Sequence, residues 1–148
     1  MKSLLCSLLL VLFASSILSA SLAAEDEGVT LTVEVTNIPG VKGDLLIGLF
    51  DSAETFTVTP LPQSPKIPIV SVEPVKAEIK NLKPGTYAVV VIHDLNSNGK
   101  LDKVFGMPKE PIAFSNNPVI PRGVPAFEAC TFVVADKDLS IVIPLKLK

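Results

Sequence analysis

Apolar and polar residues alternate along two stretches of this 148-residue chain, 29–36 and 75–80. Successive side chains of a β-strand point to opposite faces, so this period of two predicts two strands, each buried on one face. Two other stretches, 45–50 and 87–92, are apolar at nearly every position. Such runs are typical of central strands that are covered on both sides.

Proline interrupts the chain between these stretches. Five of the 13 prolines lie in residues 51–74, and residues 103–125 contain five more together with two glycines. Proline lacks an N–H and fixes φ, so the first region is predicted to be a surface connection that tolerates only edge pairing. The second is predicted to hold no regular element. Its apolar residues, among them Phe105 and Phe114, indicate that it packs onto the domain.

The C-terminal part of the chain predicts two last strands, near 130–134 and 139–147, with Pro144 at a sheet edge or bulge. After residue 24, no stretch shows sustained helical periodicity. We therefore predict an all-β chain. The expected architecture is one antiparallel β-sandwich of about seven strands, with less than about 10% helix.

The N-terminus has the pattern of a secretory signal peptide. Lys2 precedes an apolar run at 4–18, and small residues follow up to Ala24. The run of about 15 residues is shorter than the roughly 20 that a transmembrane helix needs, so cleavage is predicted and an uncleaved anchor is the alternative. The predicted organisation is a signal peptide at 1–23 and a single domain at 24–148. After cleavage no membrane span remains, and the protein is expected to be secreted or periplasmic.

The 13 basic and 15 acidic side chains give the chain a net charge of −2. They form no basic stripe for a phosphate backbone, so nucleic acid is excluded as a predicted partner. Of the two cysteines, Cys6 lies in the leader, which leaves Cys130 without a partner for an intramolecular disulfide. The apolar neighbours of Cys130 in the sequence predict a buried, unreactive thiol.

The segment 94–102 carries oxygen-bearing side chains at positions 1, 3, 5 and 9, with a glycine at position 6. This spacing is typical of calcium-binding loops, in which a hard cation takes about six to eight oxygen ligands. We therefore predict a weak Ca²⁺ site. The predicted ligands are the side chains of Asp94, Asn96, Asn98 and Asp102, the main-chain carbonyl of Lys100, and Glu110 or water to complete the shell.

A plain β-hairpin is the alternative interpretation of this segment. Asn98-Gly99 is a strong hairpin signal, because both residues accept positive φ without a metal. The flanks of a hairpin should alternate apolar and polar residues, however, and here the polar residues recur on one side. A complete helix-loop-helix calcium site is not expected, because Phe105 stands where the glutamate at its twelfth position would be.

Few residues of the chain are suited to catalysis. His93 is the only histidine, and as a strand neighbour of Asp94 it points to the opposite face, so the two do not form a base and its orienting partner. We expect a hydrogen-bonded or surface histidine. Zinc would need histidine and cysteine ligands that the sequence lacks. A hydrolase that uses carboxylates alone, for example Asp102 with Glu110, stays open.

Four motifs in order resemble exported bacterial proteins grouped as domain of unknown function 2141: NLKPGTY at 81–87, HDLNSNGKLD at 93–102, GMPKE at 106–110 and AFSNN at 113–117. The resemblance covers nearly the whole chain after the leader. It implies a transthyretin- or prealbumin-like sandwich, and the acidic segment is similar to loops that bind calcium in repeat modules of bacterial surface proteins. Ile112-Ala113 departs from the family, whose members often have an aromatic residue and glycine there.

Three functions follow as hypotheses. The favoured one is an exported, non-catalytic module that binds a protein, glycan or small molecule, or has a structural role, with an acidic loop stabilised by calcium. The alternatives are a small enzyme that uses carboxylates in the cleft beside that loop, and a transthyretin-like carrier of an apolar ligand. A pocket between residues 103–125 and the sheet, with polar groups beside Glu110, would favour ligand binding or catalysis. A filled, flat surface would favour a structural module.

Overall fold

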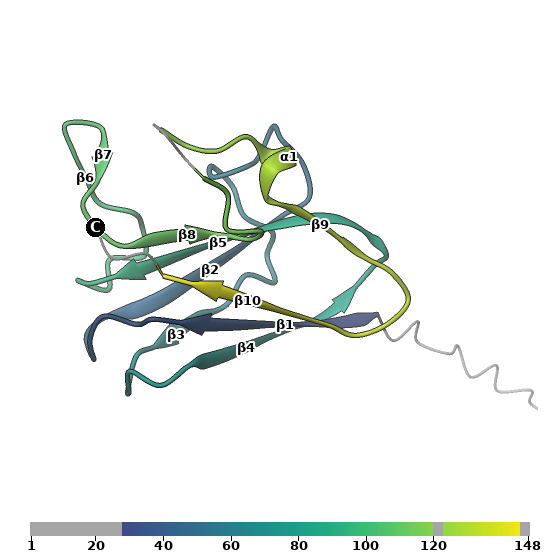
Figure 1. The fold of residues 1–148 in the computed structure, drawn as a ribbon, viewed down its shortest axis with the longest axis horizontal. Coiled ribbons are helices and arrows are strands. Elements are labelled where there is room, and N and C mark those ends of the chain that lie inside the picture. The colour runs from purple at the N-terminus through teal and green to yellow at the C-terminus, as the bar shows by residue number, and fades with distance from the viewer. Residues whose placement is uncertain (1–27, 120–122, 146–148) are drawn as a thin grey trace, which may run out of the picture.

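The computed structural model describes residues 28–119 and 123–145, so the predicted signal peptide lies outside the described residues. The regular elements of this part of the chain are β-strands, apart from one helix of four residues (Figure 1), which confirms the predicted all-β class. It contains no helix long and apolar enough to cross a membrane. The elements are β1 (Val29–Thr36), β2 (Asp44–Phe50), β3 (Lys66–Pro68), β4 (Val75–Leu82), β5 (Gly85–Asp94), β6 (Lys103–Val104), β7 (Met107–Pro108), β8 (Ile112–Phe114), α1 (Phe127–Cys130), β9 (Thr131–Val134) and β10 (Leu139–Pro144).

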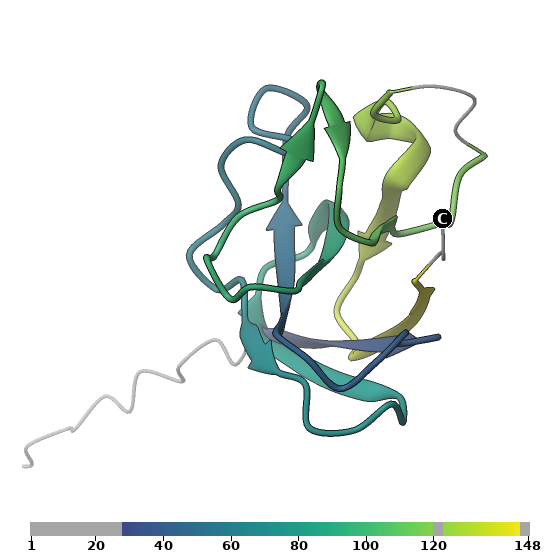
Figure 2. The same ribbon diagram turned by 90° about the vertical axis from the view of Figure 1, so that its left-hand side faces the viewer.

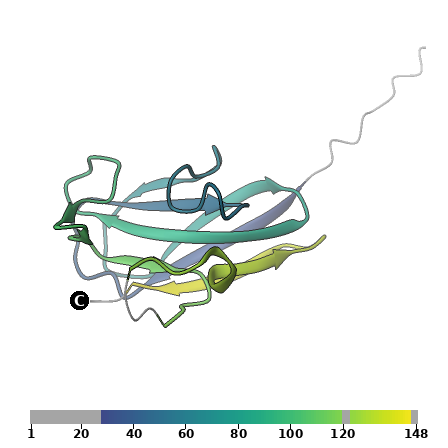
Figure 3. The same ribbon diagram turned by 90° about the horizontal axis from the view of Figure 1, so that it is seen from above.

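The strands form two main sheets and a separate hairpin. The smaller sheet has the order β10-β1-β4, and the larger has the order β3-β2-β5-β8, with β9 pairing with the first residues of β5. The long strand β5 therefore lies between β2 on one side and β8 and β9 on the other (Figure 3). The β6–β7 hairpin stands at one end of the domain, which Figure 2 views end-on. Strand β5 is the element around which the larger sheet is built.

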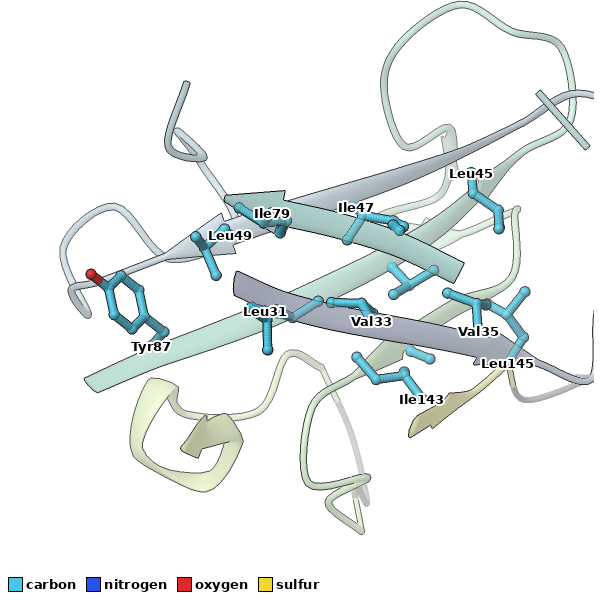
Figure 4. Close-up of a cluster of buried hydrophobic side chains, with 14 of the residues drawn as sticks. Leu31, Val33, Val35, Leu45, Ile47, Leu49, Ile79, Tyr87, Ile143 and Leu145 are labelled. Atoms are coloured by element: carbon cyan, nitrogen blue, oxygen red, sulfur yellow. The ribbon is translucent and has the colours of Figure 1, made fainter. Parts of the chain in front are cut away.

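Side chains from both main sheets meet in one hydrophobic core. Burial alternates strictly along β1, where Leu31, Val33 and Val35 are fully buried. Inward-pointing residues of β2 and β5 belong to the same cluster. Figure 4 shows these side chains gathered between the strands. The period of two in β1 and β4 thus marks the face of the smaller sheet that contributes to this core.

One strand pair differs in direction from the prediction. Strand β10 pairs with β1 in parallel, with Leu139 opposite Leu31, whereas a wholly antiparallel arrangement was predicted. A parallel pair needs a long crossover connection, and nearly the whole domain separates these two strands in the sequence. No local pattern in either strand reveals this direction.

The region 103–125 also differs, because it was predicted to hold no regular element and contains the β6–β7 hairpin and β8. The three residues of β8 include no proline, so their N–H groups are free to pair with β5 between Val90 and Ile92. In the first connection, β3 pairs with β2 at the sheet edge and ends at Pro68. That edge position agrees with the predicted restriction on proline.

A second apolar cluster lies on the outer face of the larger sheet. The ring of Phe56 contacts Phe50 and Phe127 edge-on, with centroid distances of 5.4 Å and 5.5 Å. Cys130, the last residue of α1, is fully buried in this cluster. Burial raises the pKa of its thiol to about 11. The prediction of a buried cysteine is therefore confirmed.

Replacing Cys130 by serine is expected to lower the free energy of unfolding by about 1–2 kcal/mol, because a hydroxyl would take the place of the thiol in an apolar site. Chemical denaturation of both proteins measures this change. In the native wild-type protein a thiol reagent should react slowly, since the thiolate is scarce and covered. Rapid labelling of the native protein, or a serine variant of unchanged stability, would contradict this account of Cys130.

Candidate metal site and binding groove

Strand β5 ends at Asp94, whose side chain is fully buried. Neighbouring residues of a strand point to opposite faces, so Asp94 lies on the outer face of the larger sheet and His93 on the inner face. The Asp94 Oδ1 atom accepts a hydrogen bond from the main-chain N–H of Asn98 at 3.1 Å, and Oδ2 accepts one from Gly99 at 2.6 Å. A buried carboxylate at the end of a central strand thus orders the loop that follows it.

The two asparagines of this acidic loop, residues 94–102, turn their side-chain amides toward Asp102. The Asn96 Nδ2 atom donates to Asp102 Oδ2 at 2.7 Å, and Asn98 Nδ2 donates to Asp102 Oδ1 at 2.9 Å. These two bonds lower the pKa of the Asp102 carboxyl below its usual value, and the bond from Asn98 has the larger effect. The side chains that the sequence spacing selects are therefore brought together.

Glu110 lies 2% exposed and joins the two ends of the acidic loop. Its Oε1 atom accepts from the N–H of Leu95 at 2.8 Å, and its Oε2 atom accepts from the N–H of Asp102 at 3.0 Å. Both oxygens are thus engaged with main-chain donors. The sequence spacing did not indicate this bridging role, and a role for Glu110 as a metal ligand stays a prediction.

The donor set of the loop fits a hard cation of the calcium type. Carboxylate and amide oxygens are the ligands that Ca²⁺ prefers, and the loop brings the side chains of two aspartates and two asparagines together. Within residues 28–119 and 123–145, no three His, Cys, Asp or Glu side chains are grouped so as to hold a metal ion. A cation would also have to displace the two asparagine donors from Asp102. Calcium binding by this loop stays a prediction, and both features favour weak over tight binding.

The alternative of a plain hairpin at Asn98-Gly99 is wrong. Strand β5 pairs with β2, β8 and β9, and β6, which follows the acidic loop, pairs with β7. The two-residue turn of this region is Phe105-Gly106, between the paired residues Val104 and Met107. The hydrogen bonds to Asp94 explain why Asn98-Gly99 forms part of an irregular loop instead.

Asp44 and Lys66 attach the acidic loop to the edge of the larger sheet, a contact that the sequence did not predict. The Lys66 Nζ atom lies 3.1 Å from Asp44 Oδ2 and 3.3 Å from the carbonyl oxygen of Ser97. Hydrogen bonds with the side chains of Ser97 and Lys66 lower the pKa of the Asp44 carboxyl, and the bond with Ser97 has the larger effect. The loop is therefore held at both its ends and its middle.

An apolar groove of about 740 Å³ lies on the outer face of the larger sheet, and we call it the binding groove. Outward side chains of β2, β5 and β8 form its floor. The acidic loop and the β6–β7 hairpin form one wall, and residues of the β2–β3 connection and of 123–124 also line it. Lining residues from these parts include Leu46, Ile92, Ile112, Leu101, Met107 and Val58.

Several apolar side chains around the binding groove are open to solvent. Val58 is 77% exposed, Met107 67% and Val124 57%. Phe105, at the tip of the neighbouring hairpin, is 99% exposed. Apolar surface that gathers around a hollow marks an interaction site more often than scattered residues do. The sequence did not predict this groove, because four separate segments form it.

Replacing Phe105 by asparagine is expected to stabilise the protein by about 0.5–1 kcal/mol. Phe105 has φ 50° and Gly106 has φ 79°, and asparagine tolerates positive φ far better than a bulky residue does. Since Phe105 is almost fully exposed, little packing is lost. Thermal unfolding would measure the gain. A loss of more than about 1 kcal/mol would mean that the phenyl ring contributes to folding after all.

His93 is 1% exposed and takes no part in the site on the outer face. Its Nε2 atom lies 2.6 Å from the carbonyl oxygen of Lys42 and donates to it. This agrees with the expectation of a hydrogen-bonded histidine. Among the described residues, the other ring nitrogen, Nδ1, has no hydrogen-bond partner. His93 and Asp94 therefore do not form a catalytic pair in this structure.

The fold and the site together define a nearly all-β domain that carries an acidic loop at the end of its central strand. The chain belongs to the family described as "Uncharacterized protein conserved in bacteria (DUF2141)", which it matches over residues 33–142. No curated protein matches it, and no solved structure does. The resemblance noted in the four motifs is thereby confirmed at the level of the family.

Proposed function

We propose that this protein is an exported, non-catalytic binding module that holds a small apolar ligand in the binding groove. The groove itself is the observation that carries the proposal. Its volume of about 740 Å³ falls within the range of roughly 300–1,000 Å³ that is common for small-molecule sites. Its floor is a rigid sheet, and such a support keeps a binding site in shape. Export is inferred from the leader pattern in residues 1–23.

The acidic loop has a supporting role in this proposal. Gly99, Lys100 and Leu101 line the groove, so the bonds that order the loop also fix one of its walls. Calcium bound by the loop oxygens would stiffen that wall further. Binding would then need less ordering of the protein, which favours affinity.

A carboxylate enzyme is less well supported than a binding module. The carboxylate oxygens of Asp102 and Glu110 accept hydrogen bonds from within the loop region. Neither residue lines the groove, whose lining is largely apolar. A pocket is therefore present beside residues 103–125, but neither of these two acidic side chains lines it.

The finer architecture that we propose is a transthyretin- or prealbumin-like β-sandwich. The hydrophobic core shared by the two main sheets supports a sandwich. The binding groove lies on the outer face of one sheet, on the side away from this core. A ligand would thus leave the folded core undisturbed.

Titration with a neutral apolar fluorophore, N-phenyl-1-naphthylamine, tests the function. We expect saturable binding at one site. Val124→Glu should weaken it by about tenfold or more, because it places a charge on the groove lining. Val142→Glu is the matched control, since Val142 on β10 is exposed to a similar extent and does not line the groove. Absence of saturable binding, or equal losses in both variants, would contradict the proposal.

A further inference from the structure

We propose that the ligand of the binding groove is a single-chain amphiphile with an anionic head group, which Lys100 and Lys103 hold. This inference rests on the proposed function and names the chemical class of its ligand. Among the residues that the structure describes, the charged ones that line the groove are these two lysines, and none of the lining residues is acidic. Apart from Thr57, the rest of the described lining is apolar or glycine.

The two lysines are available to a ligand. Lys100 and Lys103 are exposed, and neither forms an ion pair within the described part of the chain, where the paired lysines are Lys66, Lys76 and Lys80. Asp102 lies between these two lysines in the sequence, and both of its carboxylate oxygens accept hydrogen bonds from asparagine amides.

The positions of these lysines give the groove a polar end and an apolar floor. Lys100 belongs to the acidic loop and Lys103 begins β6, so both belong to the same wall. The floor carries only apolar side chains and Gly48, from β2, β5 and β8. An aliphatic chain on the floor and an anion at this wall would match both features. A neutral apolar ligand would leave two ammonium groups beside buried hydrocarbon.

Burial of the ligand's aliphatic chain would supply most of the affinity. The anionic head group would supply selectivity over neutral ligands. Apolar area removed from water stabilises a complex in proportion to chain length. Contacts between exposed lysines and an anion are individually weak, because solvent and salt screen them. A neutral molecule of equal chain length cannot form these lysine contacts, so the contacts discriminate between an anionic ligand and a neutral one.

Competition against the bound fluorophore tests the inference. The competitors are dodecanoate, dodecyl phosphate and the neutral methyl dodecanoate, used as monomers in calcium-free, low-salt buffer. We expect both anions to bind about tenfold more tightly than the ester, which corresponds to two exposed charge contacts. A preference between the two anions would identify a carboxylate or a phosphate head.

A double variant, Lys100→Gln with Lys103→Gln, should remove the preference for anions, so that dodecanoate and dodecyl phosphate bind no more tightly than the ester. The matched control is Lys83→Gln with Lys137→Gln, which changes the net charge equally at exposed sites outside the groove. Equal affinity of acid and ester in the wild-type protein would overturn the inference and leave the proposed function standing. A preference for anions that persists in the double variant would likewise overturn the inference and leave the proposed function standing. If neither the fluorophore nor any amphiphile binds, the proposed function falls as well.

Discussion

Glu110→Ala is expected to lower the free energy of unfolding by about 2–4 kcal/mol, one of the two largest effects that the structure predicts. The substitution removes both acceptors that bridge the ends of the acidic loop. The N–H groups of Leu95 and Asp102 would then lose their partners in a region that is only partly open to water. Glu110 itself is buried, so a cavity would add to the loss.

Chemical denaturation of three variants tests this role of Glu110. Glu110→Gln should fall between wild type and alanine, because its amide keeps one oxygen but turns an N–H₂ group toward a main-chain N–H. Glu128→Ala is the control at an exposed position, where we expect a change below about 0.5 kcal/mol. If Glu110→Ala is as stable as Glu128→Ala, the bridge does not stabilise the loop.

Asp94→Ala should have two effects. Without calcium, it should lower the free energy of unfolding by about 2–4 kcal/mol, because the N–H groups of Asn98 and Gly99 lose their acceptors. It should also abolish stabilisation by calcium. For a dissociation constant of about 10⁻⁴ to 10⁻³ M, the wild-type protein should gain roughly 0.4 to 1.4 kcal/mol at millimolar calcium.

Calorimetric unfolding with chelator, and with about 10 mM calcium or magnesium, separates these effects. Magnesium should act weakly, since it demands a smaller octahedral shell. The exposed Asp136→Ala is the control and should keep both the stability and the calcium gain. A wild-type protein without a calcium shift would refute the metal site. An Asp94→Ala variant that keeps the full shift would show that other residues bind the ion.

The sequence was most informative where one face of a strand is buried. Strand β1 spans the predicted residues 29–36, because its alternation follows directly from contact with a hydrophobic core. The class of the fold follows from several such strands and the absence of helical periodicity. The parallel direction of β10 could not be predicted from the sequence, because strand direction depends on how the intervening chain crosses the domain.

The site was predictable only in part, for a similar reason. The spacing of Asp94, Asn96, Asn98 and Asp102 is local, and the structure brings these side chains together. The bridge by Glu110 joins residues up to 15 positions apart, and the contact of Lys66 with the loop spans 31 positions. The binding groove needs three strands of the larger sheet and three connections. No spacing rule encodes contacts of this kind.

Amide NMR of the protein during titration with N-phenyl-1-naphthylamine tests the central claim most directly, because it locates the ligand. We predict that signals of the groove lining shift, above all those of Gly48, Ile92, Leu101 and Met107. Signals of β4 and β10, in the opposite sheet, should stay in place. Shifts confined to β4 and β10, or no saturable shifts at all, would contradict a ligand site in the binding groove.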